Sequence, residues 1–291
     1  MTIVRVACVQ LRSGREPDGN LVDAERLVRE AAGRGAVYVQ TPEMTNLLER
    51  SRDALFAKIA LEEDDRFLAR MRTVARDLSI TLHLGSLAIR RSDGKVANRA
   101  FVIAPDGCLA ARYDKIHMFD VDLANGESWR ESATYAPGRE AVLVEAAGMT
   151  VGLAICYDIR FPDLFRGYGR HGAHLLTAPA AFTRQTGEAH WHVLQRARAI
   201  ENGAFLMAAA QGGVHQDGRE TYGHSVIVDP WGRVLAEVDG AEPGVIVADL
   251  DLAGVQAARE RIPALKNERS FTLAPSAPPV FTSLGPETHV R

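Results

Sequence analysis

The chain has 291 residues, of which 46% are hydrophobic and 24% charged, a length that suits one large or two ordinary domains. The 34 Lys and Arg residues and 37 Asp and Glu residues leave a net charge of -3, whereas a nucleic-acid-binding protein is more often basic. No apolar run approaches the roughly 20 residues that a membrane-spanning helix needs, and the amino terminus lacks the plan of a signal peptide. We therefore expect a soluble, cytoplasmic protein that binds neither nucleic acid nor a membrane.

Short β-rich runs alternate with amphipathic helical windows, which is typical of the α/β class. In the first half we expect helices over residues 21–33 and 64–78 and strands over residues 3–10, 36–40, 80–89, 100–104 and 108–113. In the second half we expect helices over residues 163–170 and 188–202, strands over residues 142–145, 150–155, 174–177 and 204–211, and a hairpin over residues 224–238. The second half thus repeats the order of the first, which favours one core with two sheets related by a pseudo-twofold axis.

Two segments carry more specific expectations. In the helix over residues 188–202, the apolar face contains Val193, Leu194, Ala197 and Ile200. Residues 271–291 are rich in proline, which predicts an extended arm after a domain over residues 1–270.

Cys156 is a candidate nucleophile because it ends a strand of small and apolar residues, before a short loop and a helix. The carboxyl end of a strand is where an α/β sheet exposes reactive groups and where backbone N–H groups can face an oxyanion. The alternative is a buried structural cysteine, as we expect for Cys8. The three cysteines, with Cys108 the third, form no CxxC motif and predict no disulfide framework.

Glu43 and Lys115 also follow predicted strands. Glu43 is a candidate general base and Lys115 a candidate cation for a thiolate or an oxyanion. Taken singly, each is better explained as a surface residue. A dyad of Cys156 with His117 or His174 is a further possibility. No histidine and carboxylate pair has the spacing of a metal-binding helix, so we expect neither a metal nor an organic cofactor.

Taken together, three motifs resemble the nitrilase superfamily of carbon–nitrogen hydrolases, whose members use a Glu–Lys–Cys triad. The motifs are TPEM with Glu43, YDKIHMFD with Lys115 and GLAICYDIRFPDL with Cys156, in the family's order. The resemblance runs from about residue 3 to residue 270. It implies an αββα sandwich that commonly dimerises into a four-layer αββααββα core, and hence a homodimer or higher homo-oligomer.

The family also places an auxiliary glutamate between the lysine and the cysteine. Glu131 fits this context best, and Glu127 is the competing candidate. The resemblance further implies that Glu43 acts as general base, that Cys156 forms a thioester, and that Lys115 and the backbone N–H of Tyr157 hold the oxyanion.

Several segments resemble one branch of the superfamily, the deaminated glutathione amidases, and next to it the ω-amidases that act on α-ketoglutaramate. The ω-amidases tend to read PGAFN where this chain reads PAAFT at residues 179–183. We expect Tyr157, Phe182 and Thr183 to contact the substrate, and residues 123–129 and 215–220 to flank the pocket.

The expected reaction is hydrolysis of a small acid that carries an amide. Nitrile hydrolysis, N-carbamoyl amino acid hydrolysis and a catalytically silent interaction protein are the alternatives. Arg160 and Arg166 are expected to pair with Asp158 and Asp163.

Overall fold

The computed structural model describes residues 2–122, 126 and 128–274. The helices are α1 (Pro17–Gly33), α2 (Arg52–Lys58), α3 (Arg66–Leu78), α4 (Pro162–Arg170), α5 (Arg184–Asn202) and α6 (Ala253–Arg261), with short 3-10 turns at Glu62–Asp64, Glu131–Ala133 and Cys156–Arg160. The strands are β1 (Ile3–Gln10), β2 (Tyr38–Gln40), β3 (Thr81–Arg90), β4 (Val96–Ile103), β5 (Leu109–Asp114), β6 (Asp120–Asp122), β7 (Ser128–Arg130), β8 (Val142–Ala146), β9 (Met149–Leu153), β10 (Leu175–Thr177), β11 (Phe205–Ala208), β12 (Gly212–Val214), β13 (Glu220–Tyr222), β14 (Val226–Val228), β15 (Val234–Glu237) and β16 (Gly244–Asp251).

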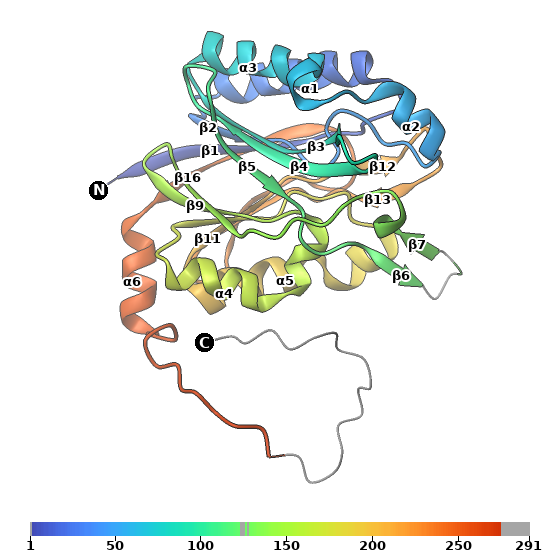
Figure 1. Ribbon diagram of the computed structural model, residues 1–291. Coiled ribbons are helices and arrows are strands. Elements are labelled where there is room, and N and C mark those ends of the chain that lie inside the picture. Colours follow the sequence, from blue (N-terminus) through green and yellow to red (C-terminus); the bar gives the residue numbers. More distant parts are fainter. Residues whose placement is uncertain (1, 123–125, 127, 275–291) are drawn as a thin grey trace.

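Two six-stranded sheets form the centre of the molecule, in the orders β16-β1-β2-β3-β4-β5 and β15-β14-β11-β10-β9-β8. Helices α1 and α3 cover the outer face of the first sheet, and α4 and α5 cover the outer face of the second (Figure 1). The layers therefore follow the order αββα, as the sequence predicts.

The two sheets have the same internal plan. In each, three parallel strands (β1-β2-β3 and β9-β10-β11) are followed by an antiparallel pair, and one antiparallel strand closes the other edge. The closing strand of the second sheet is β8, which directly precedes β9. In the first sheet it is β16, from the far end of the domain, which we did not predict from the sequence.

The central strands are buried on both faces because each lies between the opposite sheet and a helical layer. Along β1, Val4, Val6 and Cys8 face the core between the sheets, whereas Ala7 and Val9 pack in the cluster with α1 and α3. Successive side chains of a strand point to opposite faces, so the near-continuous apolar run of β1 serves two cores at once.

The predicted apolar face of α5 is wrong. Val193 is 69% exposed and Ile200 is 51% exposed, whereas the buried residues are Gly187, Trp191, Gln195, Arg198, Ala199 and Asn202. Arg198 and Trp191 tolerate this burial because they are hydrogen-bonded, whereas the side-chain amide of Gln195 has no hydrogen-bond partner among the described residues. Arg198 Nε donates to the carbonyl of Ile159 at 2.9 Å, and Trp191 Nε1 donates to that of His224 at 2.7 Å.

Helix α5 also begins at Arg184 and α1 at Pro17, in each case four residues before the predicted start. Proline suits the first helical turn because that position needs no backbone donor, which explains the early start of α1. Of the predicted arm, residues 271–274 are exposed, and the rest from residue 275 onward lies outside the described residues.

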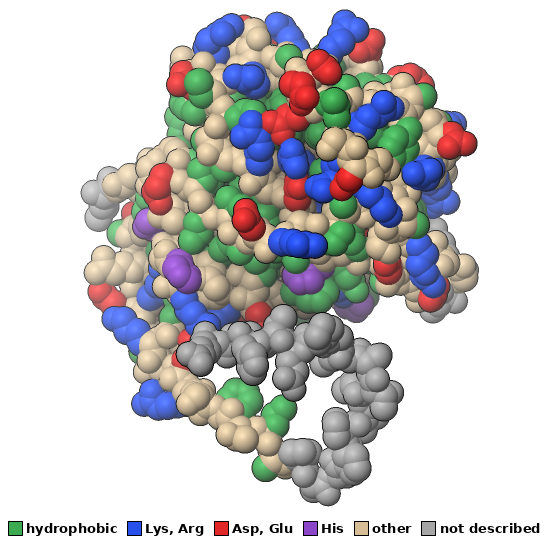
Figure 2. Space-filling view, viewed as in Figure 1, with side chains coloured by type: hydrophobic (Ala, Val, Ile, Leu, Met, Phe, Trp, Pro, Cys, Tyr) green, Lys and Arg blue, Asp and Glu red, His purple; other side chains and the backbone are tan. Residues whose placement is uncertain are grey.

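The surface carries both signs of charge. Lys and Arg side chains alternate with Asp and Glu side chains over the upper part of the face shown in Figure 2, which includes the layer of α1 and α3. Among the described residues, no helix is long and apolar enough to cross a membrane.

Gly85 allows the loop after β2 to lie against β3. A Cβ at this position would lie 2.1 Å from the carbonyl oxygen of Thr41 and 2.5 Å from Cβ of Pro179. The neighbouring Ser86 N–H donates to Pro42, and its carbonyl accepts from Thr45. This packing brings the loop that follows β2 next to the loop that follows β10.

Candidate active site

The predicted triad residues lie together, although each comes from a different part of the chain. Glu43 lies in the loop after β2, Lys115 follows β5 directly, and Cys156 lies three residues after the end of β9. All three are buried, with exposed fractions of 4%, 2% and 8% respectively. They line one cavity of about 390 Å³.

The carboxylate of Glu43 accepts hydrogen bonds at both oxygens. Oε1 accepts from Lys115 Nζ at 2.9 Å and from Asn98 Nδ2 at 2.8 Å, and Oε2 accepts from the Ala181 N–H at 2.8 Å. Burial raises the pKa of Glu43, but the charge and hydrogen bond of Lys115, helped by the other donors, outweigh it and hold the pKa below its usual value. Glu43 therefore rests as a carboxylate that can take a proton.

Lys115 lies between two carboxylates. Its Nζ is 2.9 Å from Oε1 of Glu43 and 2.9 Å from Oε2 of Glu131. Burial alone would lower the pKa of Lys115, but the charges of Glu131 and Glu43 raise it well above its usual value. The ammonium is therefore a permanent positive charge in a site from which water is largely excluded.

Cys156 opens the Cys156–Arg160 turn with φ of +49°, a left-handed conformation that is uncommon for any residue but glycine. Its N–H donates to the carbonyl of Pro179 at 2.9 Å. Burial, and then the negative charge of Glu43, raise the pKa of the thiol well above its usual value. Cys156 therefore rests as a neutral thiol that needs a base, and Glu43 supplies a hydrogen-bond acceptor for it.

Glu131, the predicted auxiliary glutamate, lies beside Lys115. Besides Lys115, its carboxylate accepts from the Phe119 N–H at 2.7 Å and from Asn98 Nδ2 at 3.1 Å. The competing candidate, Glu127, lies outside the described residues.

Asn98 links the two carboxylates, and the sequence did not lead us to it. It is 1% exposed in β4, and its Nδ2 donates to both Glu43 and Glu131. The only sequence signal is an amide inside a predominantly apolar strand, since the partners are 55 and 33 residues away along the chain.

The predicted substrate-contacting residues, Tyr157, Phe182 and Thr183, all line the same cavity as the triad. The two flanking stretches also reach it, through Ser128, Trp129 and Arg219. The other lining residues are Met44, Leu47, Leu48, Glu49, Arg50, Arg52, Leu55, Phe119, Arg130, Glu131, Thr134, Tyr135, Ala181 and Thr186. A mostly apolar wall with a few convergent charges is typical of a small-molecule site.

Arginine and tryptophan side chains form one part of this wall. The guanidinium carbons of Arg50 and Arg219 lie 4.7 Å and 4.8 Å from the ring centre of Trp129. Arg219 also lies 3.4 Å from the carboxylate of Asp217, and its buried Nε has no hydrogen-bond partner among the described residues. This wall offers positive charge to a ligand.

The histidines considered as partners of Cys156 are engaged elsewhere. His117 Nδ1 lies 2.6 Å from Asp158 Oδ1, and its ring stacks on Phe161. His174 Nδ1 accepts from the Thr150 N–H at 3.0 Å.

The expected pairing of two arginines with nearby aspartates is wrong. Asp158 instead accepts from the Tyr113 hydroxyl and the Ile155 N–H. Arg166 pairs with Glu268, and Arg160 lies over the rings of Tyr157 and Phe182. The side chain of Asp158 is buried, so it binds the backbone and phenol donors around it and not a long side chain on the surface.

Comparison with known proteins agrees with this arrangement. The chain is 38% identical over 266 residues to the deaminated glutathione amidase of Synechocystis sp., which covers 90% of this chain and 96% of the relative. It is 36% identical over 270 residues to the omega-amidase NIT2 of Homo sapiens, covering 93% and 96%.

Among solved structures, the NitFhit protein of C. elegans superposes with a TM-score of 0.85 at 34% identity, covering 92% of this chain and 65% of that one. A variant of the amidase from Nesterenkonia sp. AN1, with an acetamide moiety covalently added at its active-site cysteine, superposes with a TM-score of 0.77 at 28% identity, covering 91% and 94%. The sequence model of the carbon–nitrogen hydrolases matches residues 5–260. The chain therefore belongs to the carbon–nitrogen hydrolase family and is an amide-hydrolysing enzyme of that family.

Proposed function

We propose that the protein hydrolyses the terminal carboxamide of a small carboxylic acid, with deaminated glutathione as the first candidate substrate. The observation that supports this proposal most directly is that Cys156, Glu43 and Lys115 line one cavity, which Arg219 also lines. The similarity to a protein named as a deaminated glutathione amidase supports this choice.

In the first half of the reaction, Glu43 takes the proton of the Cys156 thiol, and the sulfur attacks the amide carbon. The carbonyl oxygen becomes an oxyanion, held by the ammonium of Lys115 and the backbone N–H of Tyr157. Glu43 then returns the proton to the amide nitrogen. The C–N bond breaks, ammonia leaves, and a thioester remains on Cys156.

In the second half, Glu43 takes a proton from water, and the hydroxide attacks the thioester carbon. The C–S bond breaks, the carboxylic acid leaves, and the proton returns to the sulfur. Glu131 and Asn98 act as positioning residues, because they hold Lys115 and Glu43 and need not touch the substrate. The covalent adduct on the cysteine of the Nesterenkonia amidase supports the nucleophile assignment.

We propose that Arg219 receives the carboxylate at the far end of the substrate. Arg219 lines the cavity, its buried Nε has no hydrogen-bond partner among the described residues, and its guanidinium lies over the ring of Trp129. Arginine suits this role because its fork of donors matches a carboxylate.

α-Ketoglutaramate is the second candidate substrate, supported by the similarity to a protein named omega-amidase. It is also a carboxylate-bearing amide, so the same triad and the same arginine serve it. The difference lies in length, because deaminated glutathione is longer and fills more of a cavity of about 390 Å³.

The deciding experiment measures ammonia release from both amides side by side, with Cys156→Ala as the blank. A clear preference in kcat/KM for deaminated glutathione supports the first candidate, and the opposite preference supports the second. Activity on a nitrile alone, or carbon dioxide release from an N-carbamoyl amino acid, moves the protein to those branches. No turnover of any compound above the blank supports the catalytically silent alternative.

We also propose that the protein is a cytoplasmic homo-oligomer. The exposed Ile200 of α5 adjoins the β14–β15 turn, since a Cβ on Gly232 would meet it, and Trp231 in the same turn is 50% exposed. Exposed apolar side chains that gather on a surface are typical of protein interfaces. Light scattering on the purified chain gives its mass, and a monomer at micromolar concentration contradicts the proposal.

The unpaired cysteines at positions 8, 108 and 156 agree with a reducing compartment such as the cytoplasm.

A further inference from the structure

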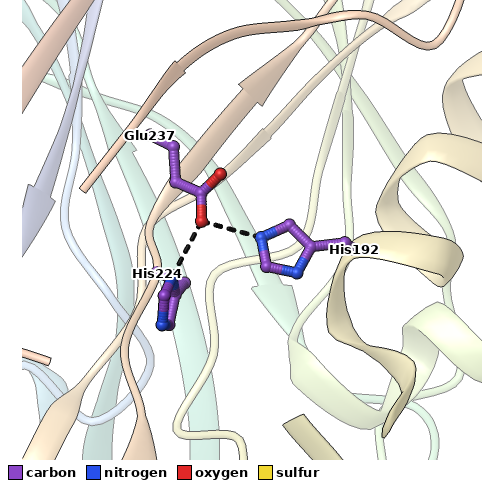
Figure 3. A group of neighbouring side chains, drawn as sticks. All are labelled: His192, His224 and Glu237. Carbon is purple, nitrogen blue, oxygen red and sulfur yellow. Dashed lines mark hydrogen bonds and ion pairs between the residues drawn. The ribbon is translucent and has the colours of Figure 1, made fainter. Parts of the chain in front are cut away.

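A second group of polar side chains lies apart from the cavity, on the other side of α5. His192 comes from α5, His224 from the segment just before β14, and Glu237 from the end of β15. Figure 3 shows the two imidazole rings pointing toward the same carboxylate oxygen. Residues from three separate elements therefore converge on one point.

The distances are short enough for a shared ligand. His192 Nε2 lies 2.8 Å and His224 Nδ1 lies 2.7 Å from Oε1 of Glu237, and the donor atoms all lie within 4.8 Å of one another. Around a tetrahedral zinc ion with bonds of about 2.0–2.1 Å, neighbouring donor atoms lie roughly 3.3 Å apart. Rotamer adjustments of about an ångström turn the present arrangement into three corners of such a tetrahedron.

Neighbouring residues hold His224 in place, and all three side chains remain partly exposed to solvent. His224 has φ of +54°, its N–H donates to Gly240, its carbonyl accepts from Trp191, and its ring stacks on Tyr222 at 4.3 Å. The side chains of His192, Glu237 and His224 are 34%, 29% and 22% exposed. A strained, well-held histidine next to solvent suits a site that an ion can enter and where water completes the coordination.

The donor set selects the class of ion. Two imidazole nitrogens and one carboxylate suit Zn²⁺ and similar transition-metal ions, whereas Ca²⁺ and Mg²⁺ prefer oxygen donors alone.

We propose that His192, His224 and Glu237 form a binding site for a divalent transition-metal ion of the zinc class, with water as the fourth ligand. Each ring, in its neutral form, binds the ion through the nitrogen that now faces Glu237 and carries its single proton on the other nitrogen, so each imidazole changes tautomer and no net proton is released. Bound there, it ties α5 to the β14–β15 hairpin. This site is separate from the amide chemistry and does not depend on the proposed substrate.

The test uses the full-length chain with Cys156→Ala, so that the active-site thiol does not take up metal. After treatment with a chelator, the protein is titrated with Co²⁺, followed by visible absorption, and with Zn²⁺, followed by calorimetry. We expect one equivalent of each ion, a tetrahedral Co²⁺ spectrum and a higher Tm with Zn²⁺. Absence of binding overturns the proposal and leaves a hydrogen-bonded trio.

The variants His192→Gln and His224→Asn identify the ligands. Each should weaken binding at least tenfold, since even the loss of a group that only supports a ligand weakens metal affinity by about 10–100-fold. His190→Gln is the matched control, because His190 lies on the same helix but contacts Arg160. Equal loss in the control, or unchanged binding in the two variants, overturns the assignment. Circular dichroism and Tm without metal show whether each variant is folded.

Discussion

Asn98 donates a hydrogen bond of 2.8 Å to Oε1 of Glu43 from inside a strand of the first sheet. Its Nδ2 also reaches Glu131 at 3.1 Å, so one amide touches both carboxylates that flank Lys115. This bond favours the charged form of Glu43, and it therefore bears on the pH range in which the base works.

The acid limb of the pH profile reports on this contact. Glu43 must be unprotonated, and its pKa is held below its usual value, so we expect kcat/KM of the wild type to decline only at a pH below the usual titration range of a glutamate. Asn98→Ala removes a donor to the carboxylate and raises the pKa of Glu43. A hydrogen bond to a charged group contributes about 1.5–3 kcal/mol, so the limb should move upward by about 1–2 pH units.

The matched control for this measurement is Asn202→Ala, which removes another buried asparagine, at the end of α5. It should leave the limb unchanged. A lower rate in Asn98→Ala with an unmoved limb contradicts the electrostatic role and makes Asn98 a packing residue.

Lys115→Ala should lower kcat by about 10²–10³-fold, because the oxyanion loses a fixed positive charge and two buried carboxylates lose their counter-ion. His117→Ala should cost less than tenfold, since His117 contacts Asp158 and Phe161. Steady-state kinetics on the preferred amide compare the two variants. The reverse order of effects points to a Cys–His hydrolase.

Arg219→Gln should lower kcat/KM for deaminated glutathione by tenfold or more, mainly through KM, and leave a neutral aliphatic amide within about twofold. A charge-assisted hydrogen bond lost from a desolvated site is worth about 1.5–3 kcal/mol. Arg233→Gln is the control, since Arg233 also pairs with an aspartate but lies on the surface, 75% exposed. Equal losses on the acidic and the neutral amide contradict a carboxylate contact.

Gly85→Ala should disturb catalysis from a position that does not line the cavity. The new Cβ overlaps the carbonyl of Thr41, so the loop with Glu43 must move, at a cost of about 1–3 kcal/mol in stability. We expect a lower Tm and at least a tenfold loss of kcat. Gly19→Ala in α1 meets nothing within 4 Å and should be neutral or stabilising by up to about 1 kcal/mol. Full activity in Gly85→Ala contradicts the proposed packing constraint.

The sequence predicted the parts of the fold that depend on local patterns. The strands around Cys156 and Glu43 are short apolar runs that end at polar residues, and their repeated order predicts one core with two sheets. The αββα order of the layers was implied by the resemblance to the nitrilase superfamily. The buried face of α5 was not predicted, because Arg198 is inside and hydrogen-bonded while Val193 is outside. The spacing of hydrophobic residues along a helix does not show whether an arginine is buried and hydrogen-bonded or exposed to solvent.

Contacts between residues far apart in the sequence could not be predicted either. Asn98, Trp129 and Arg219 have no motif of their own, and their meaning comes from partners supplied by other strands and loops. The same holds for His192, which looks unremarkable beside His190 along the helix until His224 and Glu237 are placed next to it.

The pairing of β1 with β16 constrains the order in which this protein can be completed during synthesis. Residue 3 lies opposite residue 251, so the first strand to leave the ribosome waits for nearly the whole domain before its outer edge is covered. Until then β1 presents unpaired N–H and C=O groups, which invite pairing with other chains. A truncation that removes β16 should therefore leave the hydrolytic residues in the chain but yield a protein that aggregates.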